Sequence, residues 1–196
     1  ILIAGGTGFI GFHLAKKLLS KKGYKVIGID NLNSYYDVKL KYARLKQLKK
    51  YKNFYFSKID LIERKKIDKI FRSFKINIVI NLAAQAGVRY SLHNPDQYIN
   101  SNVLGFYTLL EVMKKYNVKK LLFASSSSVY GKIKSKIFSE SLITDKQISL
   151  YATSKKINEV FMNFYGSVYN FSNIGMRFFT VYGPYGRPDM AYFKFT

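Results

Sequence analysis

A glycine-rich turn at the start of the chain places the strongest constraint on the fold. A short apolar run, Ile1–Ala4, leads into the segment GGTGFIG at Gly5–Gly11, and a helical pattern follows at once. Glycines at this spacing allow a tight turn between a strand and a helix whose N-terminal N–H groups face the turn. Such helix ends bind pyrophosphate. The segment therefore predicts the first βαβ unit of a dinucleotide-binding domain.

The rest of the chain alternates between short apolar runs and amphipathic helical stretches. This pattern predicts an α/β fold, a Rossmann-type doubly wound parallel sheet with helices on both faces. The expected strands are Ile1–Ala4, Tyr24–Asp30, Asn53–Asp60, Asn77–Ala83, Lys119–Ser125 and Asn173–Phe179. The expected helices are Phe9–Lys22, Asp37–Lys50, Glu63–Phe74, Asp96–Tyr116 and Ser149–Tyr169. The helix at Asp37–Lys50 looks like an ordinary surface helix with its lysines in solvent.

The charge of the chain limits the kinds of partner. Its 196 residues include 33 Lys and Arg against 11 Asp and Glu, a formal net charge of +22. Lysine greatly outnumbers arginine and is scattered along the expected helices, which favours a solvated surface over a nucleic-acid site. The positive field would still attract an acidic substrate.

The chain also lacks the usual marks of metal sites, disulfides and membrane spans. It has no cysteine, which excludes disulfides and thiolate metal sites and suits a reducing, cytoplasmic location. His13 and His93 are far apart and have no partner at metal-binding spacing, so we expect no metal. No apolar run approaches the length that a membrane-spanning helix needs.

Asp30 ends the second expected strand, directly after the first strand–turn–helix unit. An acid at this point can accept hydrogen bonds from the ribose hydroxyls of an adenosine. Because its negative charge would repel a 2′-phosphate, Asp30 favours NAD over NADP as the cofactor.

A second group of residues indicates chemistry near the middle of the chain. Tyr151 and Lys155 lie four residues apart in an expected helix and therefore on one face. A nearby ammonium group lowers the pKa of a phenol, so Lys155 could make Tyr151 a base near neutral pH. The serine run Ser125–Ser128 ends the preceding strand, and ligands of doubly wound sheets bind at the carboxyl ends of the strands.

Together with further segments, these residues resemble the extended short-chain dehydrogenase/reductase family, which includes the NAD-dependent nucleotide-sugar epimerases and dehydratases. The matching segments follow the family's order along the whole chain. They are Gly5–Gly11, Asp30, Asp60-Leu61, Leu82–Ala84, SSSSVYG at Ser125–Gly131, Tyr151 with Lys155, and RFFTVYGP at Arg177–Pro184.

The resemblance implies a role for each matching residue. Tyr151, Lys155 and Ser126 would be catalytic, with Tyr151 as the base. The residues implied to bind NAD are Gly5, Gly8, Phe9, Ile10, Gly11, Asp30, Asn31, Asn33, Asp60, Leu61, Leu82, Ala83, Ala84, Gln85, Asn100, Ser125, Tyr151 and Lys155. The residues implied to bind the UDP-sugar are Arg89, Ser126, Ser127, Ser128, Tyr151, Thr180 and Arg187. We also expect a homodimer.

Finer motifs resemble the UDP-glucuronate 4-epimerases of that family. They are DNLNSYYD at Asp30–Asp37, AQAGVRYS at Ala84–Ser91 and GPYGRPDMA at Gly183–Ala191. The family's 4,6-dehydratases carry an Asp-Glu pair just before VYG, and its glucuronate decarboxylases carry a Glu. Ser127 and Ser128 stand there in this chain and have no group that titrates in the useful range. This difference favours oxidation and reduction at C4 without elimination or decarboxylation.

The side chains expected around the sugar suit a negatively charged substrate. Thr180 stands where many relatives have Asn, and its small hydroxyl suits a sugar carboxylate. Arg89 and Arg187 are candidate partners for a carboxylate or a phosphate, because the guanidinium group is permanently charged and binds such groups with two hydrogen bonds.

We therefore expect NAD-dependent 4-epimerisation of a UDP-sugar, by transient oxidation at C4 and return of the hydride. UDP-glucuronate and UDP-galacturonate are the favoured pair, in the synthesis of capsule or cell-surface polysaccharide. The alternatives are a UDP-glucose 4-epimerase, a UDP-glucuronate decarboxylase and a catalytically silent NAD-binding regulatory protein. Residues 1–180 would form the NAD-binding Rossmann domain, and residues 181–196 would begin a small substrate-binding domain of a chain that looks truncated.

Overall fold

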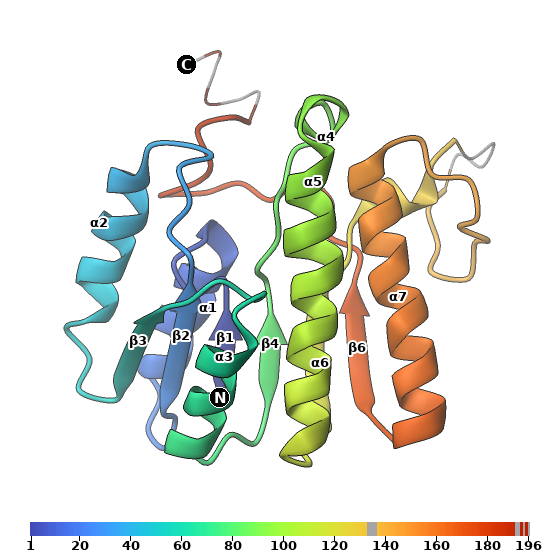
Figure 1. Ribbon diagram of the computed structural model, residues 1–196. Helices are drawn as coiled ribbons and strands as arrows, with labels where there is room; N and C mark the ends of the chain where they lie inside the picture. The colour runs from blue at the N-terminus through green and yellow to red at the C-terminus, as the bar shows by residue number, and fades with distance from the viewer. Residues whose placement is uncertain (133–136, 191–192, 194, 196) are drawn as a thin grey trace.

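The computed structural model describes residues 1–132, 137–190, 193 and 195. Its described strands are all parallel and form one sheet in the order β3-β2-β1-β4-β5-β6 (Figure 1). They are β1 (Leu2–Ala4), β2 (Val26–Asp30), β3 (Phe54–Lys58), β4 (Val79–Asn81), β5 (Lys120–Ala124) and β6 (Ser172–Met176). This is the strand order of the doubly wound dinucleotide-binding fold, so the expected Rossmann-type sheet is confirmed.

The helices lie on both faces of the sheet. They are α1 (Phe9–Leu19), α2 (Val38–Leu48), α3 (Arg64–Ser73), α4 (Tyr90–His93), α5 (Pro95–Tyr98), α6 (Gly105–Lys115) and α7 (Leu150–Tyr169). A π-helical segment, η1 (Ile99–Leu104), joins α5 to α6, and a 3-10 turn, η2 (Ser127–Tyr130), follows β5. The long helix expected at Asp96–Tyr116 is thus found as α5, η1 and α6 in succession, and the short α4 was not expected.

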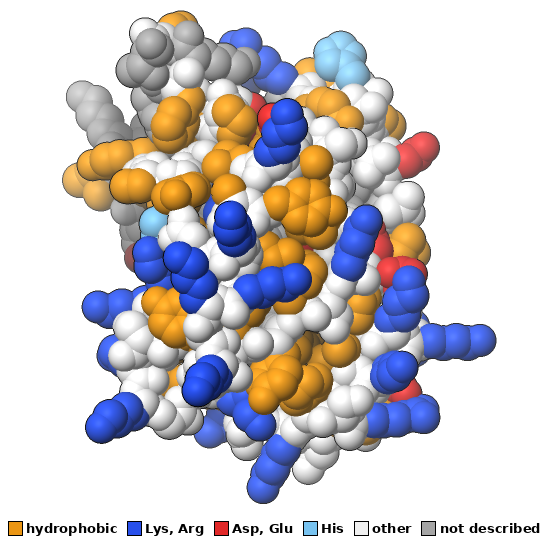
Figure 2. Space-filling model, turned by 90° about the vertical axis from the view of Figure 1, so that its left-hand side faces the viewer, with side chains coloured by type: hydrophobic (Ala, Val, Ile, Leu, Met, Phe, Trp, Pro, Cys, Tyr) orange, Lys and Arg blue, Asp and Glu red, His pale blue; other side chains and the backbone are white. Residues whose placement is uncertain are grey.

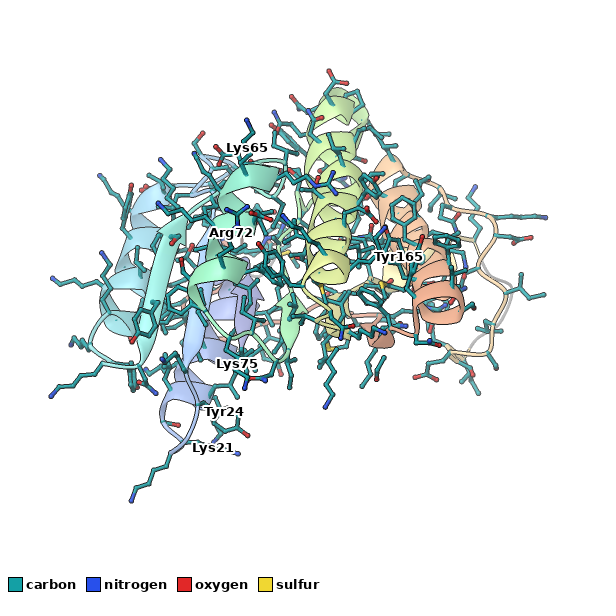
Figure 3. The ribbon with its side chains drawn as sticks, turned by 60° about the horizontal axis from the view of Figure 1, so that its bottom comes forward. Lys21, Tyr24, Lys65, Arg72, Lys75 and Tyr165 are labelled. Carbon is teal, nitrogen blue, oxygen red and sulfur yellow. The ribbon has the colours of Figure 1, made fainter. Side chains whose placement is uncertain are left out.

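Two hydrophobic cores hold the layers together. Leu2 and Ala4 of β1 face the core beneath α3, α6 and α7, whereas Ile3 faces the core beneath α1 and α2. All three side chains are fully buried. A strand that is covered on both faces needs apolar residues at every position, which explains its continuous apolar run. On the first face, the Tyr165 hydroxyl of α7 donates to Glu111 of α6 at 2.7 Å (Figure 3).

The many basic side chains do not gather into one patch on the face around α2 and β3, where they are interspersed with polar and apolar groups (Figure 2). Others, such as Lys21 and Lys75, lie at the lower edge of the sheet, away from the carboxyl ends of the strands (Figure 3). Within the described ranges, no helix combines the length and the hydrophobicity that crossing a lipid bilayer requires.

The structure corrects the expectation that α2 is an ordinary surface helix. Its buried face carries Lys41 and Arg44 together with Leu45 and Leu48. These four residues have the spacing of one helical face. The sequence analysis was wrong here because it assigned all lysines of α2 to solvent, where such residues usually lie, and gave Arg44 no role.

Arg44 joins three parts of the chain around the glycine turn. Its guanidinium group is fully buried and donates to the backbone oxygen of Thr7 at 3.0 Å and to the Tyr36 hydroxyl at 2.7 Å. A further hydrogen bond reaches the backbone oxygen of Tyr185 at 2.6 Å. The segment after β6 therefore crosses the carboxyl edge of the sheet and is fixed against α2 (Figure 1).

Replacing Arg44→Met should lower the free energy of unfolding by about 1–3 kcal/mol, because buried acceptors lose their donors. Urea denaturation of the intact protein measures this loss. Lys46→Met is the matched control, since Lys46 is exposed on the same helix, and it should change stability by less than about 0.5 kcal/mol. Equal losses in the two variants would show that the buried hydrogen bonds of Arg44 contribute nothing.

Candidate active site

A large pocket of about 1040 Å³ lies along the carboxyl ends of the strands. Its centre is the gap between the loops that follow β1 and β4, where the chain leaves the sheet toward opposite faces. Open α/β sheets bind their ligands at such a switch point. The volume lies just above the usual range for small-molecule and cofactor sites, about 300–1,000 Å³.

The glycine turn forms the floor of this pocket and leaves no room for side chains. Gly5 has a φ of +77°, and a Cβ on it would lie 2.7 Å from the backbone nitrogen of Ala83. A Cβ on Gly11 would lie 2.1 Å from the backbone oxygen of Gly5. Because α1 begins directly after Gly8, the turn offers a bare backbone at a helix N-terminus. This cradle fits the pyrophosphate of a dinucleotide.

Asp30 is held rigidly at one end of the pocket. Its carboxylate accepts hydrogen bonds from the backbone N–H of Leu32 at 2.9 Å and from that of Thr7 at 3.3 Å. The Lys41 ammonium lies 3.7 Å from the same carboxylate. Asp30 therefore connects the end of β2 to the glycine turn, in the position expected for a ribose-binding acid.

The other polar residues at this end form a connected group. The Asn31 amide donates to Asp60 at 2.8 Å, and the Lys41 ammonium donates to Asn33 at 2.8 Å. Asn31, Asn33 and Asp60 had been assigned to the cofactor, and all three line the pocket.

Tyr151 and Lys155 lie at the opposite end, on the first turns of α7. Ser149 caps this helix, since its hydroxyl accepts a hydrogen bond from the backbone N–H of Ala152 at 3.1 Å. The cap fixes the start of the helix. Both side chains line the pocket, together with Ser126 in the turn after β5. The three residues named as catalytic are therefore brought together.

The protonation of Tyr151 depends on its neighbours. Burial raises the pKa of its hydroxyl, whereas a hydrogen bond with Ser126 and the positive charge of Arg187 act in the opposite direction. The sequence analysis expected Lys155 to lower this pKa. In the structure the Lys155 ammonium instead donates to the backbone oxygen of Ala124 at 2.8 Å, and Ser126 and Arg187 are the groups that favour the phenolate.

Arg187 reaches the same end of the pocket from the segment after β6. Its guanidinium group forms two hydrogen bonds to the Asp189 carboxylate, at 3.0 and 2.5 Å. The Tyr35 hydroxyl also donates to Asp189, at 3.1 Å. Burial and the charge of Asp189 raise the pKa of Tyr35 to about 12, so this hydroxyl stays protonated and keeps donating.

Nearly all of the residues assigned from the sequence converge on this pocket. Those that line it are Gly5, Gly8, Phe9, Ile10, Gly11, Asp30, Asn31, Asn33, Asp60, Leu61, Leu82, Ala83, Ala84, Gln85, Arg89, Ser125, Ser126, Ser127, Ser128, Tyr151, Lys155, Thr180 and Arg187.

Asn100, also assigned to the cofactor, is exposed on η1 and does not line the pocket. Asn102, two residues later, is buried instead. Its amide oxygen accepts a hydrogen bond from the backbone N–H of Gln85 at 2.7 Å, and its amide nitrogen donates to the backbone oxygen of Gln85 at 3.0 Å. The π-helical turn explains the difference, because it changes which side chains of the helix face the sheet. A regular helical pattern in the sequence gives no sign of such a turn.

The sequence analysis missed several residues of the pocket wall. Tyr35, Tyr36 and Asp189 line it, and all three belong to motifs that the resemblance had already singled out. Lys41 also lines the pocket. Its spacing from Arg44, Leu45 and Leu48 was the available signal, since the four residues share a helical face. In the described part of the chain, no cluster of three or more His, Cys, Asp or Glu residues offers a metal site.

Comparison with known proteins agrees with this geometry. The family described as GDP-mannose 4,6 dehydratase matches residues 2–196. This chain belongs to that family. The expected membership of the extended short-chain dehydrogenase/reductases is thereby confirmed. Ser127 and Ser128 precede the VYG motif of this chain.

The similar proteins include epimerases. Protein CapI of Staphylococcus aureus is 54% identical over all of this chain, which covers 58% of that protein. A UDP-glucuronate 4-epimerase of Thermodesulfobacterium geofontis is 48% identical, over 99% of this chain and 59% of its own length. The structure of a UDP-glucuronic acid 4-epimerase from Bacillus cereus, in complex with UDP-glucuronic acid and NAD, matches with a TM-score of 0.91 at 34% identity. It matches over 98% of this chain and 60% of its own. The chain thus spans about 60% of the length of these relatives.

Lys155 gives a prediction about pH. Burial lowers the pKa of its ammonium group from 10.5 to about 8, so between these values the unfolded chain binds more protons than the folded one. Lys155 should therefore make the fold more stable as the pH rises from about 8 to 10.5, by up to about 1.4 kcal/mol per pH unit.

Urea denaturation of the intact protein at several pH values in this range, with and without Lys155→Met, measures the effect. The stability of the unmodified protein relative to Lys155→Met should rise with pH. The same comparison with Lys65→Met, a change at an exposed position of α3, should stay flat. If the stability difference between the unmodified protein and Lys155→Met did not change with pH, burial would not lower the pKa of Lys155.

Proposed function

We propose that this chain carries the cofactor-binding and catalytic residues of an NAD-dependent UDP-glucuronate 4-epimerase, which interconverts UDP-glucuronate and UDP-galacturonate. The observation that carries the proposal is one pocket with a dinucleotide cradle and Asp30 at one end and Tyr151, Ser126 and Lys155 at the other. The names of the relatives support the same activity. The sequence similarity to protein CapI supports a role in capsule synthesis. A cytoplasmic location remains a prediction.

The residues of the pocket fit NAD. The bare backbone of Gly5–Gly11 would hold the pyrophosphate, Asp30 the adenosine ribose, and Lys155 the ribose of the nicotinamide. Bound NAD supplies a hydride acceptor for C4 of the sugar and later a hydride donor.

Tyr151 would take the proton of the sugar 4-hydroxyl and return it after the sugar has turned. The Ser126 hydroxyl and the charge of Arg187 favour the phenolate that this role requires. Tyr151, Ser126 and Arg187 thus perform the proton transfer without any acidic residue.

The wall around the sugar suits a uronate. Ser127, Ser128 and Thr180 offer hydroxyl groups, and Arg89 and Arg187 offer positive charge. Among the described lining residues, the acids are Asp30 and Asp60 at the ribose end and Asp189, which is paired with Arg187. The serine run therefore carries no acid that could act in elimination or decarboxylation.

Incubating the intact protein with UDP-glucuronate tests the proposal directly. NMR should show UDP-galacturonate as the main product, formed without added cofactor if NAD stays bound. A UDP-pentose as the main product would establish a decarboxylase. Turnover of UDP-glucose alone would establish a neutral-sugar epimerase, and no turnover of any UDP-sugar would favour a silent NAD-binding protein.

The base can be tested separately. Tyr151→Phe should lower kcat by at least about 100-fold, since the proton acceptor is removed, while calorimetry should still show NAD binding. Tyr24→Phe is the control, because Tyr24 lies at the opposite edge of the sheet (Figure 3) and should leave kcat unchanged. Near-normal turnover in Tyr151→Phe would remove Tyr151 from the mechanism.

We also propose a homodimer. Val160, Phe164 and Val168 are about half exposed and lie on one face of α7 at a spacing of four residues. A continuous apolar stripe on a helix favours burial against a partner, and a second copy offers a matching stripe.

Light scattering should give the dimer mass for the intact protein and the monomer mass for Phe164→Glu. Ile143→Glu, at another exposed position, should remain dimeric, and an unchanged mass for Phe164→Glu would exclude this interface.

A further inference from the structure

The Arg187 guanidinium, the proposed partner of the sugar carboxylate, is already paired with a carboxylate of this chain. Asp189 accepts hydrogen bonds from its Nε and Nη2 atoms at 3.0 and 2.5 Å. Both side chains line the pocket and are about one-quarter exposed. The guanidinium group therefore stands in the pocket as half of an ion pair, and its charge is offset before any substrate arrives.

A second group holds Asp189 in this position. The Tyr35 hydroxyl donates to its carboxylate at 3.1 Å. The centre of the Tyr35 ring lies 5.9 Å from the Arg187 guanidinium and 5.0 Å from the centre of the Tyr90 ring. A Cβ on Gly87 would collide with the Tyr35 hydroxyl. The loops that follow β2 and β4 thus pack together around Tyr35, which fixes Asp189 beside Arg187.

Asp189 keeps its charge at neutral pH. Burial by itself would raise the pKa of this carboxyl group, but the hydrogen bonds and charge of Arg187 and the hydroxyl of Tyr35 hold that pKa below its usual range. Tyr35 remains a donor, because burial and the charge of Asp189 raise its own pKa to about 12. The pair of Arg187 and Asp189 is therefore neutral as a whole.

The donors left on Arg187 can still bind a sugar carboxylate. A guanidinium group has five N–H donors, and the hydrogen bonds to Asp189 use two of them. An incoming carboxylate can thus accept hydrogen bonds from Arg187, but it meets a second carboxylate on the same guanidinium group. Because like charges repel, Asp189 weakens the attraction that Arg187 alone would exert.

A moderate hold suits a reaction in which the sugar turns. In 4-epimerisation the hydride leaves one face of C4 and returns to the other, so the ring has to present both faces to the same cofactor. The carboxylate is attached to C5, next to C4, and moves with the ring. An ion pair with an unshared guanidinium group would stabilise one orientation of the ring and slow the turn.

We propose that Asp189 is a specificity-determining residue, which shares Arg187 with the sugar carboxylate and so limits how tightly the uronate is held. With Asp189 ionised, the uronate binds to a neutral pair and can turn between the two half-reactions. Without that charge, Arg187 binds the carboxylate more tightly and the ring turns more slowly. The inference rests on the proposed function in one respect, that the sugar carboxylate lies at Arg187.

UDP-glucuronate and UDP-glucose are the matched probes, because they differ only in the carboxylate that replaces a hydroxymethyl group at C5. Their binding is measured by calorimetry on the intact protein with Tyr151→Phe, so that turnover does not interfere. Adding Asp189→Asn should shift the ratio of the two affinities at least tenfold toward UDP-glucuronate, a difference of about 1.4 kcal/mol. The asparagine keeps a carbonyl oxygen for Arg187 and Tyr35, so the fold should be retained.

Kinetics give a second measurement. With Tyr151 in place, Asp189→Asn should lower both KM and kcat for UDP-glucuronate, and kcat should fall at least threefold, because the uronate is held more tightly and turns more slowly. If Asp189 served only to keep the wall folded, its loss would release Arg187. KM for UDP-glucuronate would then rise, and the ratio of affinities would shift toward UDP-glucose.

Asp68→Asn is the matched control, since it removes the carboxylate of another Asp–Arg pair, on α3 and outside the pocket. It should change neither the ratio nor kcat. Adding Arg187→Gln to Asp189→Asn should abolish most of the shift, because Asp189 acts through Arg187. Asp189→Ser, a second neutral variant, should shift the ratio in the same direction as Asp189→Asn, so the test does not depend on one variant.

An unchanged or reversed ratio in the neutral variants would overturn the inference and leave the proposed function standing. If the intact protein neither bound nor epimerised UDP-glucuronate, both would fall.

Discussion

The contact between the glycine turn and the loop after β4 is the constraint on which the site depends. A side chain at Gly5 would collide with the backbone of Ala83, and one at Gly11 would collide with the turn itself. The close approach brings the ends of β1 and β4 together and leaves bare N–H groups at the start of α1. The pocket exists because these two loops meet there without side chains between them, and the other functional residues are arranged around it.

Cations in and beside this pocket give it its chemical character. Lys41 and Lys155 are buried in its wall, Arg187 is a partly exposed part of the wall, and Arg44 is buried beside it. Each is held by hydrogen bonds to carbonyl, carboxylate or amide oxygens. Burying a charge is costly unless it is paired or hydrogen bonded. The hydrogen bonds of these four side chains offset the cost of removing their charges from water. A cofactor with a pyrophosphate and a substrate with a diphosphate and a carboxylate are the kinds of molecule that such a pocket favours.

Much of the fold and of the site follows from local patterns in the sequence. The glycine turn, the apolar strands and the segments that end them determine which residues meet at the carboxyl edge, because parallel strands all end there. The buried faces of polar helices do not follow in the same way. Lys41 was expected in solvent, but its burial depends on Asp30 at the end of β2, and that of Arg44 depends on Tyr36 and Tyr185. The local helical pattern does not show these contacts between segments. Asn100 was expected at the cofactor but lies on the exposed side of a π-helical turn. The hydrophobic periodicity of the sequence does not show such a turn. The boundary proposed at residue 180 remains a prediction.

Retention of a C4 label tests the central claim, that this site oxidises and reduces the sugar at C4 without exchange with water. UDP-glucuronate labelled with deuterium at C4 is incubated with the intact protein in ordinary water, and the product is examined by NMR. The account predicts UDP-galacturonate that keeps its deuterium at C4, because the hydride returns to the carbon that lost it. Loss of the deuterium to solvent would contradict the account, because the hydrogen would then have left C4 as a proton.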